Sequence, residues 1–135
     1  MKFAIQENLL PGRTFRERCQ RAKSLGFAGL EVQAEGLEDR LYEVAEALDA
    51  SGLRIASVHL GKQDGYLSPE LEKREAAIAT MRQAMATAVD LLAEHVVFVP
   101  QWGALTTPNL KPYRSSEEMA SELMIWLLRT VSDLA

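Results

Sequence analysis

Residues 51–60 of the chain read SGLRIASVHL, and this stretch has the pattern of a helix that ends and a strand that follows. Gly52 is typical of the position just after a helix, because a residue without a Cβ adopts the left-handed conformation at little cost. Residues 55–60, IASVHL, are predicted to form the strand that follows. Residues 25–32, LGFAGLEV, repeat the pattern with Gly26 in the place of Gly52. The sequence therefore uses the same helix-to-strand unit more than once.

The rest of the chain continues this alternation of helix and strand. Strands are predicted at residues 3–5, 30–32, 55–60 and 96–99, the last being an unbroken apolar run of the kind that is buried on both faces. Helices are predicted between them, with capping residues at Thr14, Ser68 and Ser115, and the last helix runs through Ala135. Parallel strands joined by right-handed helical crossovers are the expected arrangement. We therefore predict an α/β fold of four βα units, with residues 1–135 as one domain.

Length and composition limit the function classes. The 135 residues are 47% hydrophobic and 25% charged, with a net charge of -4, which is typical of a soluble globular domain. A protein that coats nucleic acid normally has a basic surplus, so no nucleic-acid partner is expected. The longest run of large apolar residues, 123–128, is far shorter than the roughly 20 residues that cross a bilayer, so no membrane partner is expected either. The single Cys19 and the lack of a signal-peptide pattern indicate the cytoplasm.

The lengths of the predicted loops indicate where a site lies. The helix-to-strand turns near residues 26, 52 and 94 are short, whereas three strand-to-helix connections are long, at residues 6–13, 61–67 and 101–114. In α/β proteins the ligand binds at the carboxyl ends of the strands, where these long loops gather. We therefore expect the functional site at that edge of the sheet.

Two residues on the predicted strands have side chains suited to catalysis. His59 ends the third strand, where an imidazole can ligate a metal, bind a substrate hydroxyl or transfer a proton; a hydrogen-bonded structural histidine is the alternative. Glu31 lies between Leu30 and Val32 and therefore faces away from the helices that these two contact. An ionised carboxylate is costly to bury without a partner or a cation. Glu31 is a site candidate if the sheet closes into a barrel, and a solvated side chain if the sheet stays open.

Amides and an aromatic ring follow the first and fourth strands. Gln6 and Asn8 come after the first strand, and Gln101 and Trp102 come after the fourth. A polyol site uses such groups, because the ring stacks on C–H faces and the amides exchange hydrogen bonds with hydroxyls. Each residue alone is a weak signal, and a loop tryptophan is often a packing anchor. Their shared edge of the sheet is what favours a sugar site.

Other features exclude some enzyme classes and indicate a partner. The chain has no glycine-rich phosphate loop, Cys-x-x-Cys pair or His-Glu-x-x-His motif, so a P-loop enzyme and a zinc ribbon are excluded. The last helix has more apolar residues than one buried face needs. They are Met119, Leu123, Met124, Ile125, Trp126, Leu127, Leu128, Val131 and Leu134. We expect a second face of this helix to pack against a partner copy or missing sequence, with a fully covered central helix as the alternative.

Residues 25–32 and 51–60, with the long helix and apolar strand of residues 74–99, resemble the βα units of xylose isomerase-like TIM barrels. That superfamily groups sugar and sugar-phosphate isomerases and epimerases with nucleases of the AP-endonuclease type. The resemblance implies that the four units are half of a (β/α)₈ barrel, with an open flavodoxin-like sheet as the alternative. It matches His59 to a histidine that contacts substrate or a metal, and Glu31 to an acid that faces the barrel interior. Val99 stands where the nucleases have a histidine, which disfavours DNA repair.

The resemblance also implies which groups are missing. A complete barrel takes about 250 residues, and in the isomerases the carboxylates that hold a divalent metal (Mn, Mg, Co or Zn) come from the fifth to eighth strands. For this chain alone the resemblance leaves two alternatives, no metal or a metal ligated by His59.

The hypothesis is therefore the N-terminal half of a sugar or sugar-phosphate isomerase or epimerase. A full-length relative would use metal-assisted proton transfer next to a carbonyl. Here His59 and Glu31 would be catalytic, and Gln6, Asn8, Gln101 and Trp102 would bind the sugar. The alternative is an inactive half-barrel that forms a homodimer or binds a small ligand.

Overall fold

The computed structural model describes residues 1–133 and contains the predicted alternation of strands and helices. The elements are β1 (Ala4–Gln6), α1 (Phe15–Ser24), β2 (Gly29–Gln33), α2 (Leu41–Ser51), β3 (Arg54–His59), α3 (Leu71–Asp90), β4 (His95–Val97) and α4 (Ser116–Val131). Short 3₁₀ turns, Glu7–Leu9 and Glu38–Arg40, follow β1 and precede α2. Leu134 and Ala135, which we predicted in the last helix, lie outside the described residues.

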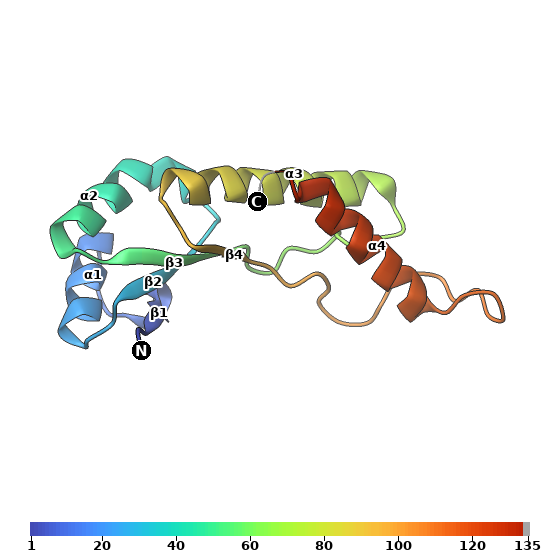
Figure 1. The fold of residues 1–135 in the computed structure, drawn as a ribbon, viewed down its shortest axis with the longest axis horizontal. Helices are drawn as coiled ribbons and strands as arrows, with labels where there is room; N and C mark the ends of the chain where they lie inside the picture. The colour runs from blue at the N-terminus through green and yellow to red at the C-terminus, as the bar shows by residue number, and fades with distance from the viewer. Residues whose placement is uncertain (134–135) are drawn as a thin grey trace. The chain divides into compact units, whose positions relative to one another are not determined.

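The four strands form one parallel sheet in the order β1-β2-β3-β4 (Figure 1). Successive strands are neighbours, as in the wall of a (β/α)₈ barrel. A flavodoxin-like sheet would instead place the first strand between the second and the third. The predicted α/β fold of four parallel βα units is confirmed, and the flavodoxin-like alternative is wrong.

The chain divides into two compact units. The first contains residues 1–61 and 86–97, and therefore the whole sheet with α1 and α2; the second contains residues 62–85 and the chain from 98 onward. Each is described here by itself. The expectation of one domain stays a prediction.

The core of the first unit lies between the sheet and its helices. Leu30, Val32, Ile55 and Val58 point from β2 and β3 into a buried cluster that includes Cys19. The predicted caps hold these helices in place: the hydroxyl of Thr14 accepts a hydrogen bond from the Glu17 backbone N–H, and Gly52 ends α2 at φ 69°. Burial raises the pKa of the Cys19 thiol, so this cysteine stays neutral in the core.

Strand β3 contains an irregularity that the sequence did not predict. Leu30 pairs with Ile55, but the next residue, Glu31, pairs with Ser57, so Ala56 is an extra residue in β3. Regular alternation would point Ile55 and Val58 to opposite faces of the sheet, because they are three positions apart. Both are buried in the helix-covered core. The bulge reconciles these two requirements, and it moves Ser57 beside Glu31.

Strand β4 differs from its prediction. We expected residues 96–99 to be buried on both faces, but the strand covers His95–Val97, with His95 and Val97 exposed and Val96 half-buried. The reason is that β4 is the edge strand and only its helix-facing side, at Val96, packs against the core. Strand β1 is also shifted, by one residue, because Gln6 continues its pairing with β2 at Glu31.

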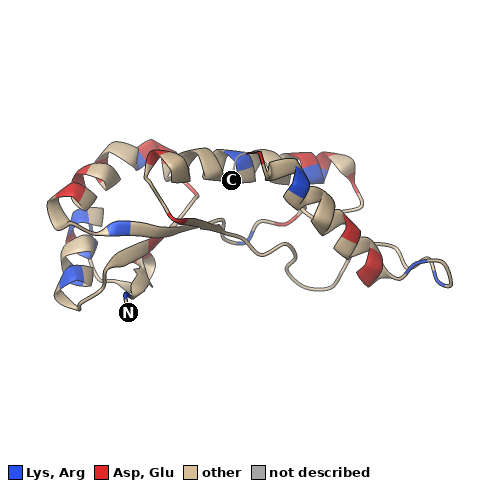
Figure 2. Cartoon of the chain, in the orientation of Figure 1, with Lys and Arg blue, Asp and Glu red and all other residues tan. Residues whose placement is uncertain are grey.

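The second unit is organised around α4 and the first part of α3. Ser115 and Glu118 form the predicted capping box, and Figure 2 marks acidic residues in red in the first turn of α4, where their charge complements the helix dipole. Arg82 of α3 donates a hydrogen bond to the carbonyl of Thr130 at 2.6 Å. Tyr66 is buried edge-on against Phe98, with ring centroids 5.3 Å apart, and burial raises its pKa to about 12. The phenol is therefore neutral at physiological pH.

Helix α4 has apolar residues on two faces. Ala120, Leu127 and Val131 are buried, whereas Ile125, Trp126 and Leu128 remain 50%, 43% and 46% exposed. The alternative of a fully covered central helix is therefore wrong for this chain. No helix within residues 1–133 is long and apolar enough to span a membrane.

A buried carboxylate ties together the loops at the carboxyl ends of β1 and β2. Glu7 is only 5% exposed, and it accepts hydrogen bonds from Arg18 of α1 at 3.3 Å and from both terminal nitrogens of Arg40. The Glu7 hydrogen bond raises the pKa of Arg40, whose guanidinium lies 5.6 Å above the ring of Phe15. Because Gln6 directly precedes Glu7, this cluster also fixes the end of β1 that bears Gln6.

We expect Glu7→Gln to lower the free energy of unfolding by about 2–3 kcal/mol, because it leaves two partly buried guanidinium groups without their anion. Urea denaturation monitored by circular dichroism measures this. Glu46→Gln is the matched control, since the Arg16–Glu46 pair is about half exposed on both sides and contributes at most about 0.5 kcal/mol. Equal effects of the two substitutions would contradict the role given to Glu7.

Candidate functional site

Three polar side chains form a hydrogen-bonded row across the first three strands. Gln6, Glu31 and Ser57 are register partners in β1, β2 and β3. One carboxylate oxygen of Glu31 accepts a hydrogen bond from the Gln6 amide, and the other accepts one from the Ser57 hydroxyl at 2.7 Å. Leu30 and Val32 are buried in the core, so the row lies on the sheet face that the helices do not cover. The half-buried carboxylate therefore has a hydrogen-bond donor at each oxygen.

His59 lies on the same face of the sheet, nearer to the carboxyl ends of the strands. It pairs with Gln33, and both are two residues beyond the members of the row. The imidazole is half-buried, and its Nδ1 accepts a hydrogen bond from the backbone N–H of Gly61 at 2.9 Å. Gly61 has φ +69°, and a Cβ there would lie 3.1 Å from the amide nitrogen of Gln33. The turn after β3 thus depends on glycine and holds the ring by one nitrogen.

The structure brings together only some of the residues selected from the sequence. Gln6 and Glu31 are in contact, and His59 shares their face. Asn8 is exposed in the 3₁₀ turn after β1, and no hydrogen bond joins it to the row within residues 1–133. Gln101 and Trp102 belong to the second unit. Whether any of these residues acts on a substrate stays a prediction.

Gln101 and Trp102 line a hollow of the second unit. Its volume is about 290 Å³, and Asp64, Glu70 and Lys73 also line it. The Gln101 amide donates to the carbonyl of Ala104 at 3.0 Å, which leaves its own carbonyl oxygen as an acceptor. The ammonium of Lys62 lies 5.6 Å from the centre of the Trp102 ring. The predicted amide and ring do occur together, beside two carboxylates.

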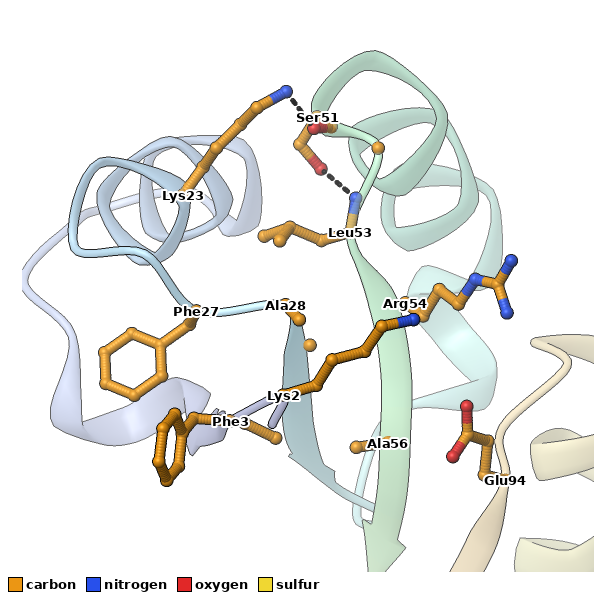
Figure 3. A pocket seen from close by; sticks show the side chains of 13 residues that line it. Lys2, Phe3, Lys23, Phe27, Ala28, Ser51, Leu53, Arg54, Ala56 and Glu94 are labelled. Carbon is orange, nitrogen blue, oxygen red and sulfur yellow. Dashed lines mark hydrogen bonds between the residues drawn. The ribbon is translucent and has the colours of Figure 1, made fainter.

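A larger hollow lies at the opposite end of the strands. Its volume is about 510 Å³, and Figure 3 shows Lys23 and Leu53 on its rim, both hydrogen-bonded to Ser51. On the sheet side it is lined by Ala4, Gly29 and Ala56, so the hollow exists because these residues are small. In a complete barrel this interior layer is filled by side chains from other strands. We therefore keep the carboxyl edge as the candidate site.

The described residues do not fit a divalent metal. Within residues 1–133 no group of three or more His, Cys, Asp or Glu side chains is close enough to hold a metal ion. The two carboxylate oxygens of Glu31 and the Nδ1 of His59 already accept hydrogen bonds. A metal of the kind that the resemblance implies would need further ligands that the described residues do not supply.

Sequence reasoning missed Ser57 and Gly61. Ser57 lies between the apolar residues Ala56 and Val58, and a strand that alternates regularly from Ile55 would have turned it toward the helices. The spacing of Ile55 and Val58 was the signal that a bulge is needed. Gly61 directly follows the strand that ends in His59 and Leu60, and a glycine at that point indicates a turn that returns a backbone N–H toward the strand end.

The row has the polarity of a surface that binds hydroxyl groups. Gln6 has an amide that both donates and accepts hydrogen bonds, Ser57 has a hydroxyl, and Glu31 has remaining carboxylate lone pairs. The amide of Gln33 lies on the same face, beside His59. A hydroxyl also donates and accepts, so adjacent hydroxyls can satisfy such groups without an unpaired partner. The described side chains of this row include no cation, so the row favours a neutral or hydroxyl-rich ligand over an anion.

Three solved structures with the same fold are sugar epimerases. The chain resembles 3-keto-D-glucoside 4-epimerase from E. coli with a TM-score of 0.76 and 19% identity, covering 99% of this chain and 53% of that one. It resembles D-psicose 3-epimerase determined in the presence of D-fructose with a TM-score of 0.77 and 16% identity, covering 100% of this chain and 48% of that one. It also resembles the D-psicose 3-epimerase from Clostridium cellulolyticum H10, determined with D-tagatose. The TM-score is 0.71 and the identity 16%, and the match covers 99% of this chain and 50% of that one. The chain spans about half the length of these structures.

A family model agrees with these structures. No curated protein sequence gives a significant match to the chain. The model described as the xylose isomerase-like TIM barrel matches residues 19–131, which contain β2, β3, β4 and nearly all of the helical residues. Because the chain covers about half of each of these structures, its four βα units correspond to half of a (β/α)₈ barrel. The chain therefore belongs to the xylose isomerase-like TIM barrel family.

Proposed function

We propose that this chain is the sugar-recognising half of a sugar or sugar-phosphate isomerase or epimerase. The observation that carries the proposal is the row of Gln6, Glu31 and Ser57, which gathers donors and acceptors for hydroxyl groups on the face that is the interior of a complete barrel. The sugar epimerases of the same fold support the substrate class. We place the protein in the cytoplasm, as its single buried cysteine suggests.

In this proposal each side chain has a distinct part in binding. Glu31 is held by Gln6 and Ser57, and its remaining lone pairs accept from a sugar hydroxyl. The second hydrogen of the Gln6 amide and its carbonyl oxygen bind neighbouring hydroxyls. Trp102 stacks on a C–H face of a sugar, and Gln101, Asp64 and Glu70 bind hydroxyls in the hollow of the second unit.

The reaction of a complete relative is a proton transfer at the carbon next to a carbonyl or hydroxyl. A divalent metal (Mn, Mg, Co or Zn), where one is bound, polarises that oxygen. This chain contributes orientation of the sugar and exclusion of water on one side of the barrel. The metal ligands and the base that faces the reacting carbon belong to strands that the four units do not include.

A second candidate function is self-association of the half-barrel. Helix α4 exposes Ile125, Trp126 and Leu128 beside one another on its surface, and a solvent-exposed tryptophan next to two aliphatic residues is typical of a protein interface. If the half-barrel self-associates, its partner is a second copy of this chain. Any ligand is then a small molecule that is bound but not converted.

We expect Glu31→Gln to weaken the binding of D-fructose about tenfold. An amide has one acceptor oxygen and one donor group, so either Gln6 or Ser57 loses its acceptor. The side chains of the row then rearrange, and the sugar loses a carboxylate acceptor. Titration of the ¹⁵N-labelled chain, monitored by amide chemical shifts, measures the dissociation constant. Glu94→Gln, at the opposite end of the strands, is the control and should leave it unchanged. Equal weakening by both substitutions would show that only net charge matters.

We expect the chain alone to bind D-fructose without converting it, with or without added Mn²⁺. The physical reason is that residues 1–133 offer no cluster of metal ligands. Incubation with the sugar and Mn²⁺, followed by chromatographic separation of the product sugars, is the measurement. Appreciable conversion that survives repurification would mean that the catalytic groups have been misplaced.

If the chain self-associates, we expect its mass by light scattering to rise from monomer to dimer with concentration, and Ile125→Glu to abolish the rise. A charge at the centre of an apolar contact is costly to bury. Leu92→Glu is the control, because Leu92 is 84% exposed and belongs to the first unit. A monomer at every concentration would remove this candidate.

A further inference from the structure

The ring of His59 is held in a way that decides which nitrogen carries its hydrogen. Nδ1 lies 2.9 Å from the backbone nitrogen of Gly61, and the peptide nitrogen is the donor. A backbone N–H can only donate, so Nδ1 must have a free lone pair. A neutral imidazole has one N–H, and it is therefore on Nε2.

The backbone enforces this contact. The Leu60 N–H still donates to the carbonyl of Val97 at 2.9 Å, beside the sheet, and the backbone leaves the extended conformation at Gly61, with φ +69°. A side chain at position 61 would be strained at that φ and would crowd the amide of Gln33. The N–H that fixes the ring is thus supplied by the turn and cannot be exchanged for an acceptor by a rotamer change.

From this geometry we infer that His59 is a dedicated hydrogen-bond donor, through Nε2–H, to an oxygen atom of the ligand, and is neither a metal ligand nor a general base. Either of those roles needs a lone pair on Nε2, because the lone pair of Nδ1 is already used. That the oxygen belongs to a sugar rests on the proposed function; the state of the ring does not.

The inference selects one of the two contacts that the family resemblance implies for this position, the contact with substrate, and excludes the contact with a metal. The two oxygens of Glu31 also accept hydrogen bonds, from Gln6 and Ser57. The carboxylate and the imidazole are the groups of this face that would best bind a metal, and both already accept hydrogen bonds from protein donors. Within residues 1–133 no third acidic, histidine or cysteine side chain completes a metal cluster with them. This face of the half-barrel thus presents hydrogen bonds to a ligand, and a divalent ion would be held elsewhere.

The first experiment determines the ring state by NMR. The chain has two histidines, and ¹⁵N-labelled histidine gives correlations between ring nitrogens and carbon-bound ring protons that distinguish a protonated from an unprotonated nitrogen. In mildly alkaline buffer we expect His59 to be one tautomer, with hydrogen on Nε2. The exposed His95, whose ring has no hydrogen bond within residues 1–133, is the internal control and should show both tautomers. Hydrogen on Nδ1 of His59, or a mixture like that of His95, would overturn the inference.

The second experiment adds Mn²⁺ alone. A paramagnetic ion broadens the signals of the side chains that bind it, so we expect the ring signals of His59 to broaden no more than those of His95. Selective and saturable broadening at His59 would overturn the inference.

The third experiment separates the inference from the proposed function. We expect His59→Ala to weaken D-fructose binding about three- to tenfold, and His59→Gln, which keeps an N–H donor, to recover most of the loss. Equal weakening by both variants would overturn the donor role. If the unchanged chain does not bind D-fructose at all, the proposed function fails, while the tautomer and Mn²⁺ results still decide the state of His59.

Discussion

The arrangement of the sheet depends on one carboxylate. Glu31 lies in the middle of a parallel sheet, where an ion without partners would be costly to remove from water. Its cost is offset by a donor on each neighbouring strand, Gln6 on β1 and Ser57 on β3. Both donors exist only in the observed register, so the hydrogen bonds of one side chain connect three strands. A one-residue slip would bring Ile5 or Glu7 of the first pairing, or Ala56 or Val58 of the second, into register with Glu31, and none of these side chains donates a hydrogen bond.

The bulge in β3 is the structural solution to a conflict between packing and polarity. The helices require Ile55 and Val58 in the core, and Glu31 requires the Ser57 hydroxyl on the other face. A strand of strict alternation cannot satisfy both demands, and an inserted residue can. Ala56 is that residue, and its small side chain also lines the hollow at the amino ends of the strands. Packing on the covered face thus decides which groups reach the open face.

The last residue of β1 and the first residue of the 3₁₀ turn after it show how recognition and stability are divided between adjacent residues. Gln6 belongs to the row and donates to Glu31. Glu7, the next residue in the chain, accepts hydrogen bonds from Arg18 and Arg40. The cluster at Glu7 uses its charges internally, so it orders the loops without adding a cation to the ligand face. His59 is fixed by similar means, because the Gly61 backbone, and no side chain, holds its ring. Recognition groups are therefore positioned by neighbours that do not themselves face a ligand.

Local sequence determined the elements and the face on which each side chain lies. The capping residues Thr14 and Ser115, the glycine at position 52 and the alternation around Glu31 each act within a few residues, so their effect is readable along the chain. The tertiary structure alone decided the bulge, the exposure of β4 and the contacts of Glu31 and His59. These depend on which strand is an edge, which register the core selects and where a turn directs its N–H. Such relations join residues about 25 positions apart or depend on φ at one glycine. A local pattern can indicate one of them, as the spacing of Ile55 and Val58 does for the bulge, but it does not determine them.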